Sequence, residues 1–164
     1  MINIIIVDDH LILREGIKRI IDDTPDINIV AEASSGPEAI NLILANKYDL
    51  VLLDISMPGQ NGLQTLKLIK KYNNKLPVLM LSMHSEEQYA MRSIKAGASG
   101  YITKDTVPNE LVIAIRKINT GRKFISKEVA ELLTIDLYHT DDKELYEHLS
   151  DREFEILKLI AKGK

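Results

Sequence analysis

The sequence predicts an α/β fold over roughly residues 1–121: a doubly wound parallel sheet of five strands with helices on both faces. Two observations support this prediction. Short apolar runs rich in β-branched residues recur along the chain, which is typical of strands buried on both faces of a parallel sheet. Amphipathic segments with helical spacing separate these runs, and parallel neighbouring strands need such right-handed crossovers.

Each element has its own local pattern. The strands are predicted at 3–7, 27–33, 50–53, 78–81 and 101–102, and the helices at 11–21, 37–46, 63–72, 86–96 and 108–120. Ser35 and Glu38 have the spacing of a capping box, with a proline at an early helical position, and Ser85 with Gln88 forms a second box. Gly97 stands where the fourth helix should end.

After Gly121 the alternation of strands and helices stops. Residues 126–135 predict another helix, and the polar, acid-rich stretch 136–147 predicts a linker. A third capping box, formed by Ser150 and Glu153, precedes a last amphipathic helix. The chain is accordingly divided into three segments: a domain at 1–121, a helical and acidic linker at 122–148, and a helix at 149–164.

Composition restricts the class of protein. The 164 residues carry a formal net charge of -3, so no general positive field attracts nucleic acid or an anionic membrane. Cysteine is absent, which excludes disulfides, thiolate catalysis and thiolate metal sites and favours a cytoplasmic location. The N-terminal apolar run is too short, and too soon followed by acids, for a signal peptide or a membrane span.

Polar side chains follow four of the predicted strands. They are Asp8 and Asp9 after the first strand, Asp54 after the third, Ser82 after the fourth and Lys104 after the fifth. In an open parallel sheet, ligands bind outside the carboxyl ends of the strands, where these groups should converge. Three neighbouring carboxylates repel one another or become protonated unless a cation joins them. Oxygen ligands favour Mg²⁺, so the sequence predicts a magnesium site.

Asp54 has a second chemical role open to it. A carboxylate beside a metal ion can attack a phosphoryl donor and form an aspartyl phosphate. Phosphoryl transfer needs mainly alignment and charge neutralisation, so Lys104 and the Ser82 hydroxyl could bind the phosphoryl oxygens without a separate general base. His10 and His84 are expected to flank this site as solvated or hydrogen-bonded side chains, because three acids suffice for Mg²⁺.

Structural roles compete with these functional ones. Asp9 could be the N-cap of the first helix, Asp54 could start a turn, and Ser82 could be a turn or cap residue. Lys104 by itself would more often be a solvated lysine. The combination of acids, hydroxyl and lysine at successive strand ends favours the functional roles.

Four motifs, in this order and spacing, resemble the receiver domain of bacterial two-component response regulators: VDDH at 7–10, LLDISMPGQNG at 52–62, MLSMH at 80–84 and GYITKD at 100–105. The resemblance covers about the first 121 residues. It implies a flavodoxin-like sheet with the strand order 2-1-3-4-5.

The resemblance also implies residue roles. Asp54 is the expected phosphoacceptor and, with Lys104, the expected catalytic pair. The expected metal ligands are Asp8, Asp9, Asp54 and the backbone carbonyl of Ser56. The expected phosphate-binding and switch residues are Ser82, Lys104 and Tyr101, although Tyr101 taken alone could be a half-buried strand aromatic.

The stretch LSDREFEILKLIAKGK at 149–164 is similar to the start of the LuxR-type DNA-binding domain, which implies a regulator of the NarL/LuxR-type subfamily. That domain needs two further helices to place a recognition helix in the major groove, so we expect a chain truncated within it. Residues 122–164 contain eight Lys or Arg and ten Asp or Glu. We therefore expect this chain by itself to bind DNA poorly or not at all.

The function predicted from these patterns is a phosphorylation-gated switch. A sensor histidine kinase would phosphorylate Asp54 in a Mg²⁺-dependent step, and the added charge would favour a homodimer and control a C-terminal DNA-binding domain. The chain would catalyse only its own phosphorylation and dephosphorylation, so it would not be an enzyme in the usual sense. Two alternatives stay open: a Mg²⁺-dependent phosphatase that forms an aspartyl phosphate, and a phosphorylation-independent dimerisation module with a vestigial acid cluster.

Overall fold

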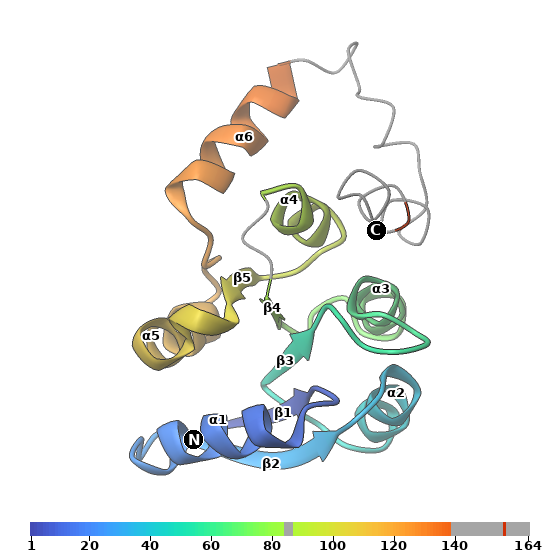
Figure 1. Ribbon diagram of the computed structural model, residues 1–164, viewed down its shortest axis with the longest axis vertical. Coiled ribbons are helices and arrows are strands. Elements are labelled where there is room, and N and C mark those ends of the chain that lie inside the picture. The colour runs from blue at the N-terminus through green and yellow to red at the C-terminus, as the bar shows by residue number, and fades with distance from the viewer. Residues whose placement is uncertain (84–86, 139–155, 157–164) are drawn as a thin grey trace.

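The computed structural model describes residues 1–83, 87–138 and 156. Five parallel strands form one sheet in the order β2-β1-β3-β4-β5, which confirms the predicted flavodoxin-like topology. The strands are β1 (Ile2–Val7), β2 (Ile27–Ala33), β3 (Leu50–Asp54), β4 (Val78–Ser82) and β5 (Gly100–Thr103). Figure 1 shows helices on both faces of the sheet. One face carries α1 (Leu11–Asp22) and α5 (Val107–Asn119), and the other carries α2 (Gly36–Ala45), α3 (Gly62–Tyr72) and α4 (Glu87–Lys95).

Alternate residues of β1, β3 and β4 contribute to two separate cores. In β1, Ile5 and Val7 pack with the helices α2, α3 and α4, whereas Ile4 and Ile6 pack with α1 and α5. All four side chains are fully buried. Burial of each is worth about 1.5–3 kcal/mol, so both faces of the strand contribute to stability. This two-sided burial explains why the strands occur in the sequence as continuous apolar runs.

The predicted capping box of α2 forms only in part. Ser35 Oγ accepts a hydrogen bond from the Glu38 N–H at 3.3 Å, as predicted. The Glu38 carboxylate, however, accepts from the backbone N–H and the hydroxyl of Ser34, both at 2.9 Å. One oxygen of Glu38, Oε2, thus accepts from two donors of Ser34 and not from the N-cap backbone.

A complete capping box, which sequence analysis missed, begins α3. Asn61 Oδ1 accepts from the Gln64 N–H at 2.8 Å, and Gln64 Oε1 accepts from the Asn61 N–H at 3.1 Å. Asn61 and Gln64 have the required spacing, so this signal was present in the sequence. The predicted boxes at Ser85 and Ser150 lie outside the described residues.

The chain beyond α5 joins the open edge of β5. The Phe124 N–H donates to Ser99 O at 2.9 Å, and the Tyr101 N–H donates to Phe124 O at 3.1 Å, so that Gly100 and Phe124 form a parallel bridge. A Cβ atom at Gly100 would lie 2.8 Å from Phe124 O. Glycine is therefore the residue that lets this segment approach β5 so closely.

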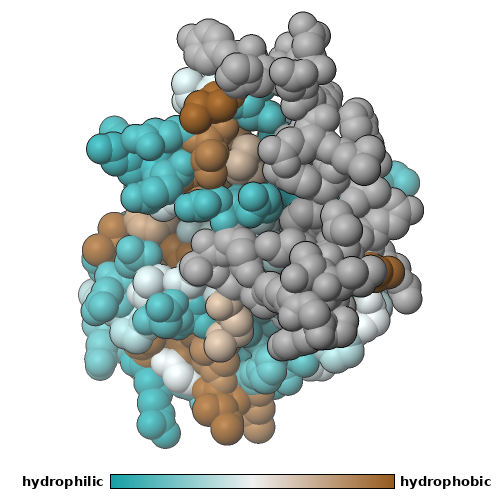
Figure 2. All heavy atoms as spheres, turned by 45° about the horizontal axis from the view of Figure 1, so that its top comes forward, coloured by the Kyte–Doolittle hydropathy of each residue, from teal (hydrophilic) through white to brown (hydrophobic). Residues whose placement is uncertain are grey.

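Helix α6 (Lys127–Tyr138) follows this bridge and packs against α4. It begins where Ser126 Oγ accepts from the Val129 N–H at 3.2 Å. The helix extends past residue 135, where the sequence predicted a polar linker to begin. Apart from Ile156, which is helical, the predicted last helix lies outside the described residues. Figure 2 shows hydrophobic and hydrophilic side chains interspersed on the described part of one face.

Candidate functional site

The predicted polar residues occupy the carboxyl-terminal edge of the sheet. Asp8 directly follows β1, Asp54 ends β3, and Ser82 ends β4. Lys104 follows β5 as the first residue of a short 3-10 helix, η1 (Lys104–Thr106). Asp8, Asp54 and Ser82 are fully buried, although they are polar or charged. Burial of such groups is costly unless their environment compensates, so this edge differs from an ordinary set of loop residues.

Lys104 joins the two buried acids. Its Nζ lies 3.0 Å from Asp8 Oδ2 and 3.1 Å from Asp54 Oδ1, and its side chain is only 7% exposed. One ammonium thus contacts carboxylates from two neighbouring strands. The arrangement brings the fifth strand's lysine to the ends of β1 and β3, so Lys104 is not a solvated side chain.

The backbone after Asp54 turns sharply and returns to it. The Ser56 N–H donates to Asp54 Oδ1 at 3.3 Å, and the Gly62 N–H donates to Ile55 O at 2.8 Å. A Cβ atom at Gly62 would lie 2.2 Å from Asp54 O, so any residue other than glycine would clash with the backbone there. Gly59 in the same loop has a φ of 75°, a conformation that glycine adopts without strain. These residues fix the loop on the backbone of Asp54.

The electrostatic environment of Asp54 disfavours its ionised form. Burial, followed by the neighbouring Asp8 carboxylate, raises the pKa of Asp54 from 3.8 to about 6. Lys104 and the Ser56 N–H act in the opposite direction without cancelling the shift. At a pH above this pKa, the ionised Asp54 carboxylate would be stabilised by additional positive charge nearby.

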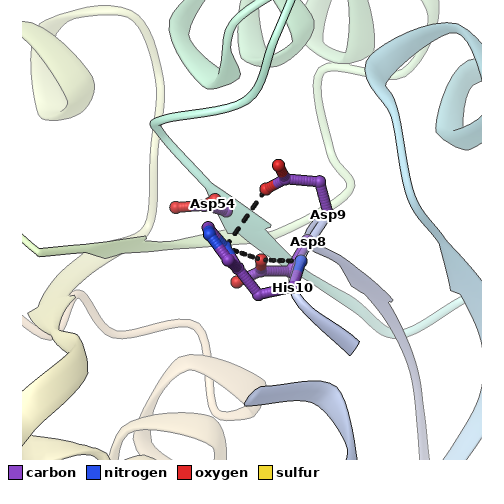
Figure 3. A group of neighbouring side chains, drawn as sticks. All are labelled: Asp8, Asp9, His10 and Asp54. Atoms are coloured by element: carbon purple, nitrogen blue, oxygen red, sulfur yellow. Dashed lines mark hydrogen bonds and ion pairs between the residues drawn. The ribbon is translucent and has the colours of Figure 1, made fainter. Parts of the chain in front are cut away.

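His10 flanks the acids as a hydrogen-bonded side chain that is 60% exposed, as the sequence predicted. Its Nδ1 is 3.0 Å from Asp8 Oδ1 and 3.2 Å from Asp9 Oδ1, and Figure 3 shows the imidazole turned toward these side chains and beside Asp54. The backbone N–H of His10 also donates to Asp8 Oδ1 at 2.8 Å. His10 itself is the N-cap residue of α1, so the alternative role of Asp9 as N-cap is wrong.

Arg14 supports the acid cluster from behind, and sequence analysis missed it. Its guanidinium donates to Asp8 O and forms an ion pair with Glu32 Oε2 at 3.0 Å, and Glu32 also pairs with Lys18. Arg14 lies four residues after His10, on the same face of α1. That spacing was visible in the sequence, but the position of Asp8 O relative to this face was not.

The other predicted residues, Ser82 and Tyr101, lie on β4 and β5, which follow the strand that ends at Asp54 in the order of the sheet. Ser82 pairs in register with Thr103, next to the strand that carries Asp54. Tyr101 in β5 is half-buried and borders a pocket of about 390 Å³ between α4, β5 and α6. His84 lies outside the described residues.

The cluster fits a divalent cation. Asp8, Asp9, His10 and Asp54 each offer a ligand atom, and these atoms lie within 4.8 Å of one another. Three buried carboxylate oxygens accept no hydrogen bond from a described residue: Asp8 Oδ2, Asp9 Oδ1 and Asp54 Oδ2. Of these, Asp8 Oδ2 has the Lys104 ammonium and Asp9 Oδ1 has the His10 ring within ion-pair distance. Buried oxygens without donors are the groups that a hard cation would satisfy.

Within the described part of the chain, no helix combines the length and the apolar character that crossing a membrane requires.

Comparisons with known proteins agree with this geometry. Residues 4–116 match the family model of the response regulator receiver domain. Response regulator UvrY of Escherichia coli O6:H1 is 37% identical over 165 residues, which cover 100% of this chain and 76% of UvrY.

Two solved structures are also similar. A two-component response regulator of the LuxR family from Aurantimonas sp. SI85-9A1 has a TM-score of 0.75 and 36% identity, over 84% of this chain and 98% of that chain. The isolated REC domain of RcsB from Salmonella enterica serovar Typhimurium, in the presence of the phosphomimetic BeF3-, has a TM-score of 0.72 and 27% identity, over 80% and 97% of the two chains. The predicted resemblance is thus confirmed, and this chain belongs to the two-component response regulators of the NarL/LuxR type.

Proposed function

We propose that this chain accepts a phosphoryl group on Asp54 in a Mg²⁺-dependent reaction and so switches the state of a regulator. One observation supports this most directly. Asp54 Oδ1 is held by Lys104 and the Ser56 N–H, whereas Asp54 Oδ2 is buried and accepts no hydrogen bond from a described residue. An oxygen held at the site but not engaged by a donor is suited to act as a nucleophile.

The chemistry requires few protein groups. The donor would be the phosphohistidine of a sensor histidine kinase or a small acyl phosphate. Asp54 Oδ2 forms a bond to phosphorus while the bond from phosphorus to the donor's leaving group breaks, and the leaving group keeps the electron pair. Asp54 reacts as a carboxylate, so no general base takes a proton from it. We propose that catalysis is limited to this self-modification and its reversal.

Charge neutralisation is the main contribution of the surrounding residues. Lys104, which contacts both Asp8 and Asp54, would pair with a phosphoryl oxygen. Asp8, Asp9, Asp54 and the Ser56 backbone carbonyl would hold Mg²⁺, which when bound supplies positive charge for the carboxylates and the phosphoryl oxygens.

The response to phosphorylation would pass through β4 and β5. We propose that the Ser82 hydroxyl and Lys104 bind the phosphoryl oxygens and that Tyr101 fills the space that Ser82 leaves. The position of Tyr101, beside the pocket between α4, β5 and α6, supports a coupling between the edge and the C-terminal segment. A coupling of about 1–3 kcal/mol would shift populations by roughly 5- to 150-fold.

The partners follow from family membership. We propose a sensor histidine kinase as phosphodonor, a homodimer as the activated state, and DNA as the target of a LuxR-type domain that continues from the C-terminal segment. The RcsB receiver domain studied with a phosphomimetic supports this use of the site.

The test is intact-mass measurement after treatment with acetyl phosphate, with and without Mg²⁺. We expect the wild type to gain the mass of one phosphoryl group only with Mg²⁺, and Asp54→Asn to gain none. Asp105→Asn is a matched control, because Asp105 is exposed at the same edge. Equal labelling of Asp54→Asn, or no labelling of the wild type, would contradict the proposal. Sustained hydrolysis of p-nitrophenyl phosphate would instead favour the phosphatase alternative.

A further inference from the structure

We propose that His10 is an inner-sphere ligand for a first-row transition ion such as Zn²⁺ or Co²⁺, so that the acid cluster takes these ions as well as Mg²⁺. This inference rests on the metal site of the proposed function and concerns the class of ion that the site selects. It departs from the sequence-based expectation, in which the acids alone were the side-chain ligands and His10 flanked them.

The distances around His10 fit adjacent positions of one coordination shell. With metal–ligand bonds of about 2.0–2.2 Å, neighbouring ligand atoms lie about 3 Å apart and opposite ones about 4 Å apart. His10 Nδ1 is 3.0 Å from Asp8 Oδ1 and 3.2 Å from Asp9 Oδ1. All four ligand atoms, including one from Asp54, lie within 4.8 Å of one another. Small side-chain movements therefore suffice to place one ion between them.

The backbone holds His10 in this position. Its N–H donates to Asp8 Oδ1 at 2.8 Å, and the residue is the N-cap of α1. Arg14, one turn further along α1, donates to Asp8 O. These bonds hold the backbone of the segment that carries the imidazole, which is turned toward the carboxylates (Figure 3). Pre-positioned ligands lose less conformational freedom on binding an ion.

The buried acids supply an independent reason for a cation here. Asp54 is fully buried, and its Oδ2 accepts no hydrogen bond from a described residue. The cluster contains three carboxylates, and the Lys104 ammonium contacts two of them, those of Asp8 and Asp54. The three carboxylates and this ammonium together carry a formal charge of two negative units when all three acids are ionised. A divalent ion would cancel that charge.

The donor set decides which ions benefit from His10. Imidazole nitrogen favours Zn²⁺, Ni²⁺, Cu²⁺ and Fe²⁺, whereas Mg²⁺ prefers oxygen and keeps several waters. Loss of the imidazole should therefore weaken binding of a transition ion more than binding of Mg²⁺. We expect His10→Gln to lower the ratio of Co²⁺ affinity to Mg²⁺ affinity by tenfold or more.

The experiment uses tag-free full chain and Co²⁺ as the probe. The proton NMR spectrum of the Co²⁺ form should contain an exchangeable imidazole N–H shifted far outside the normal range, which is a sign of direct ligation. We expect this resonance in the wild type and in His84→Gln, and we expect its loss in His10→Gln. Titration calorimetry with Co²⁺ and with Mg²⁺ then measures the affinity ratio for the three proteins.

Three results would overturn the inference: no shifted imidazole resonance in the wild type, its persistence in His10→Gln, or its loss in His84→Gln. Wild-type protein with ¹⁵N-labelled histidine and Zn²⁺ reports the ligating nitrogen directly, so a His10 variant that failed to fold would leave the question decidable. If wild-type Asp54 is labelled in the presence of Mg²⁺ but no histidine nitrogen binds the ion, this inference is rejected and the proposed function stands. Absence of labelling would reject the proposed function.

Discussion

At the scale of single residues, the buried carboxylate of Asp54 is the costly feature of this molecule. Its pKa is raised to about 6, first by burial and then by Asp8. A folded state that holds its proton more tightly than the unfolded chain loses stability as the pH rises. The buried Asp54 carboxylate therefore lowers the stability of the folded state at neutral pH.

The stability of the protein should show this cost as a pH dependence. Below pH 3.8, Asp54 is protonated in both the folded and the unfolded state. Between pH 3.8 and about 6, Asp54 ionises only in the unfolded chain, so the free energy of unfolding falls as the pH rises. Above this range the loss is complete. The full loss is about 3 kcal/mol. We expect Asp54→Asn to be more stable than the wild type in metal-free buffer, by a margin that grows by about 1–2 kcal/mol between pH 5 and 7.5. Urea unfolding at several pH values measures the margin, and a pH-independent margin would refute the assignment.

Arg14 is a second residue whose importance depends on its contacts. It donates to Asp8 O and pairs with Glu32, so Arg14→Ala leaves a partly buried carbonyl without its donor. We expect a loss of about 1–3 kcal/mol in the free energy of unfolding and a higher Mg²⁺ concentration for half-maximal thermal stabilisation.

Glu32→Gln is the matched control for Arg14, because it weakens the ion pair but keeps the bond from Arg14 to Asp8 O. We expect it to cost less than about 1 kcal/mol, as is usual for partly exposed ion pairs. Equal losses in the two variants would show that the ion pair, and not the bond to Asp8, carries the effect.

At the scale of elements, a buried side chain and an ion pair among the described residues help to attach α6 to the receiver. Val129 is buried, and Lys95 Nζ on α4 lies 2.7 Å from Asp136 Oδ2 on α6. Burial of a valine is worth about 1.5–3 kcal/mol, whereas a partly exposed ion pair contributes at most about 1 kcal/mol. Of these two contacts, the packing of Val129 therefore contributes more.

Substitutions in α6 should separate the two contributions. We expect Val129→Ala to speed hydrogen exchange of the α6 backbone amides about tenfold. We expect a smaller effect from Asp136→Asn, because the loss of the ion pair costs less free energy than the loss of buried apolar area. Ile135→Ala is the control, since Ile135 is 53% exposed and little burial is removed. Amides of β1 should exchange as in the wild type. A larger effect of Asp136→Asn than of Val129→Ala would reverse this order.

At the scale of the whole molecule, parallel strands bring distant chain segments to one edge. Residues 8, 54 and 104 meet because β1 lies beside β3 and because all five strands run in the same direction. The central strands β1, β3 and β4 are buried on both faces, so their ends are the positions where polar groups can gather. The sheet topology thus assembles the reactive edge from short segments, none of which forms the site by itself.

The sequence by itself determined the strands, the helices and the identity of the acids, because apolar periodicity and strand-end residues are local properties of the chain. The tertiary structure decided what those residues contact. Lys104 reaches two acids, His10 turns toward Asp8 and Asp9, Arg14 supports the backbone of Asp8, and Glu38 bonds to Ser34. These contacts depend on side-chain direction and on the spacing between elements, and both are set only when the helices pack on the sheet.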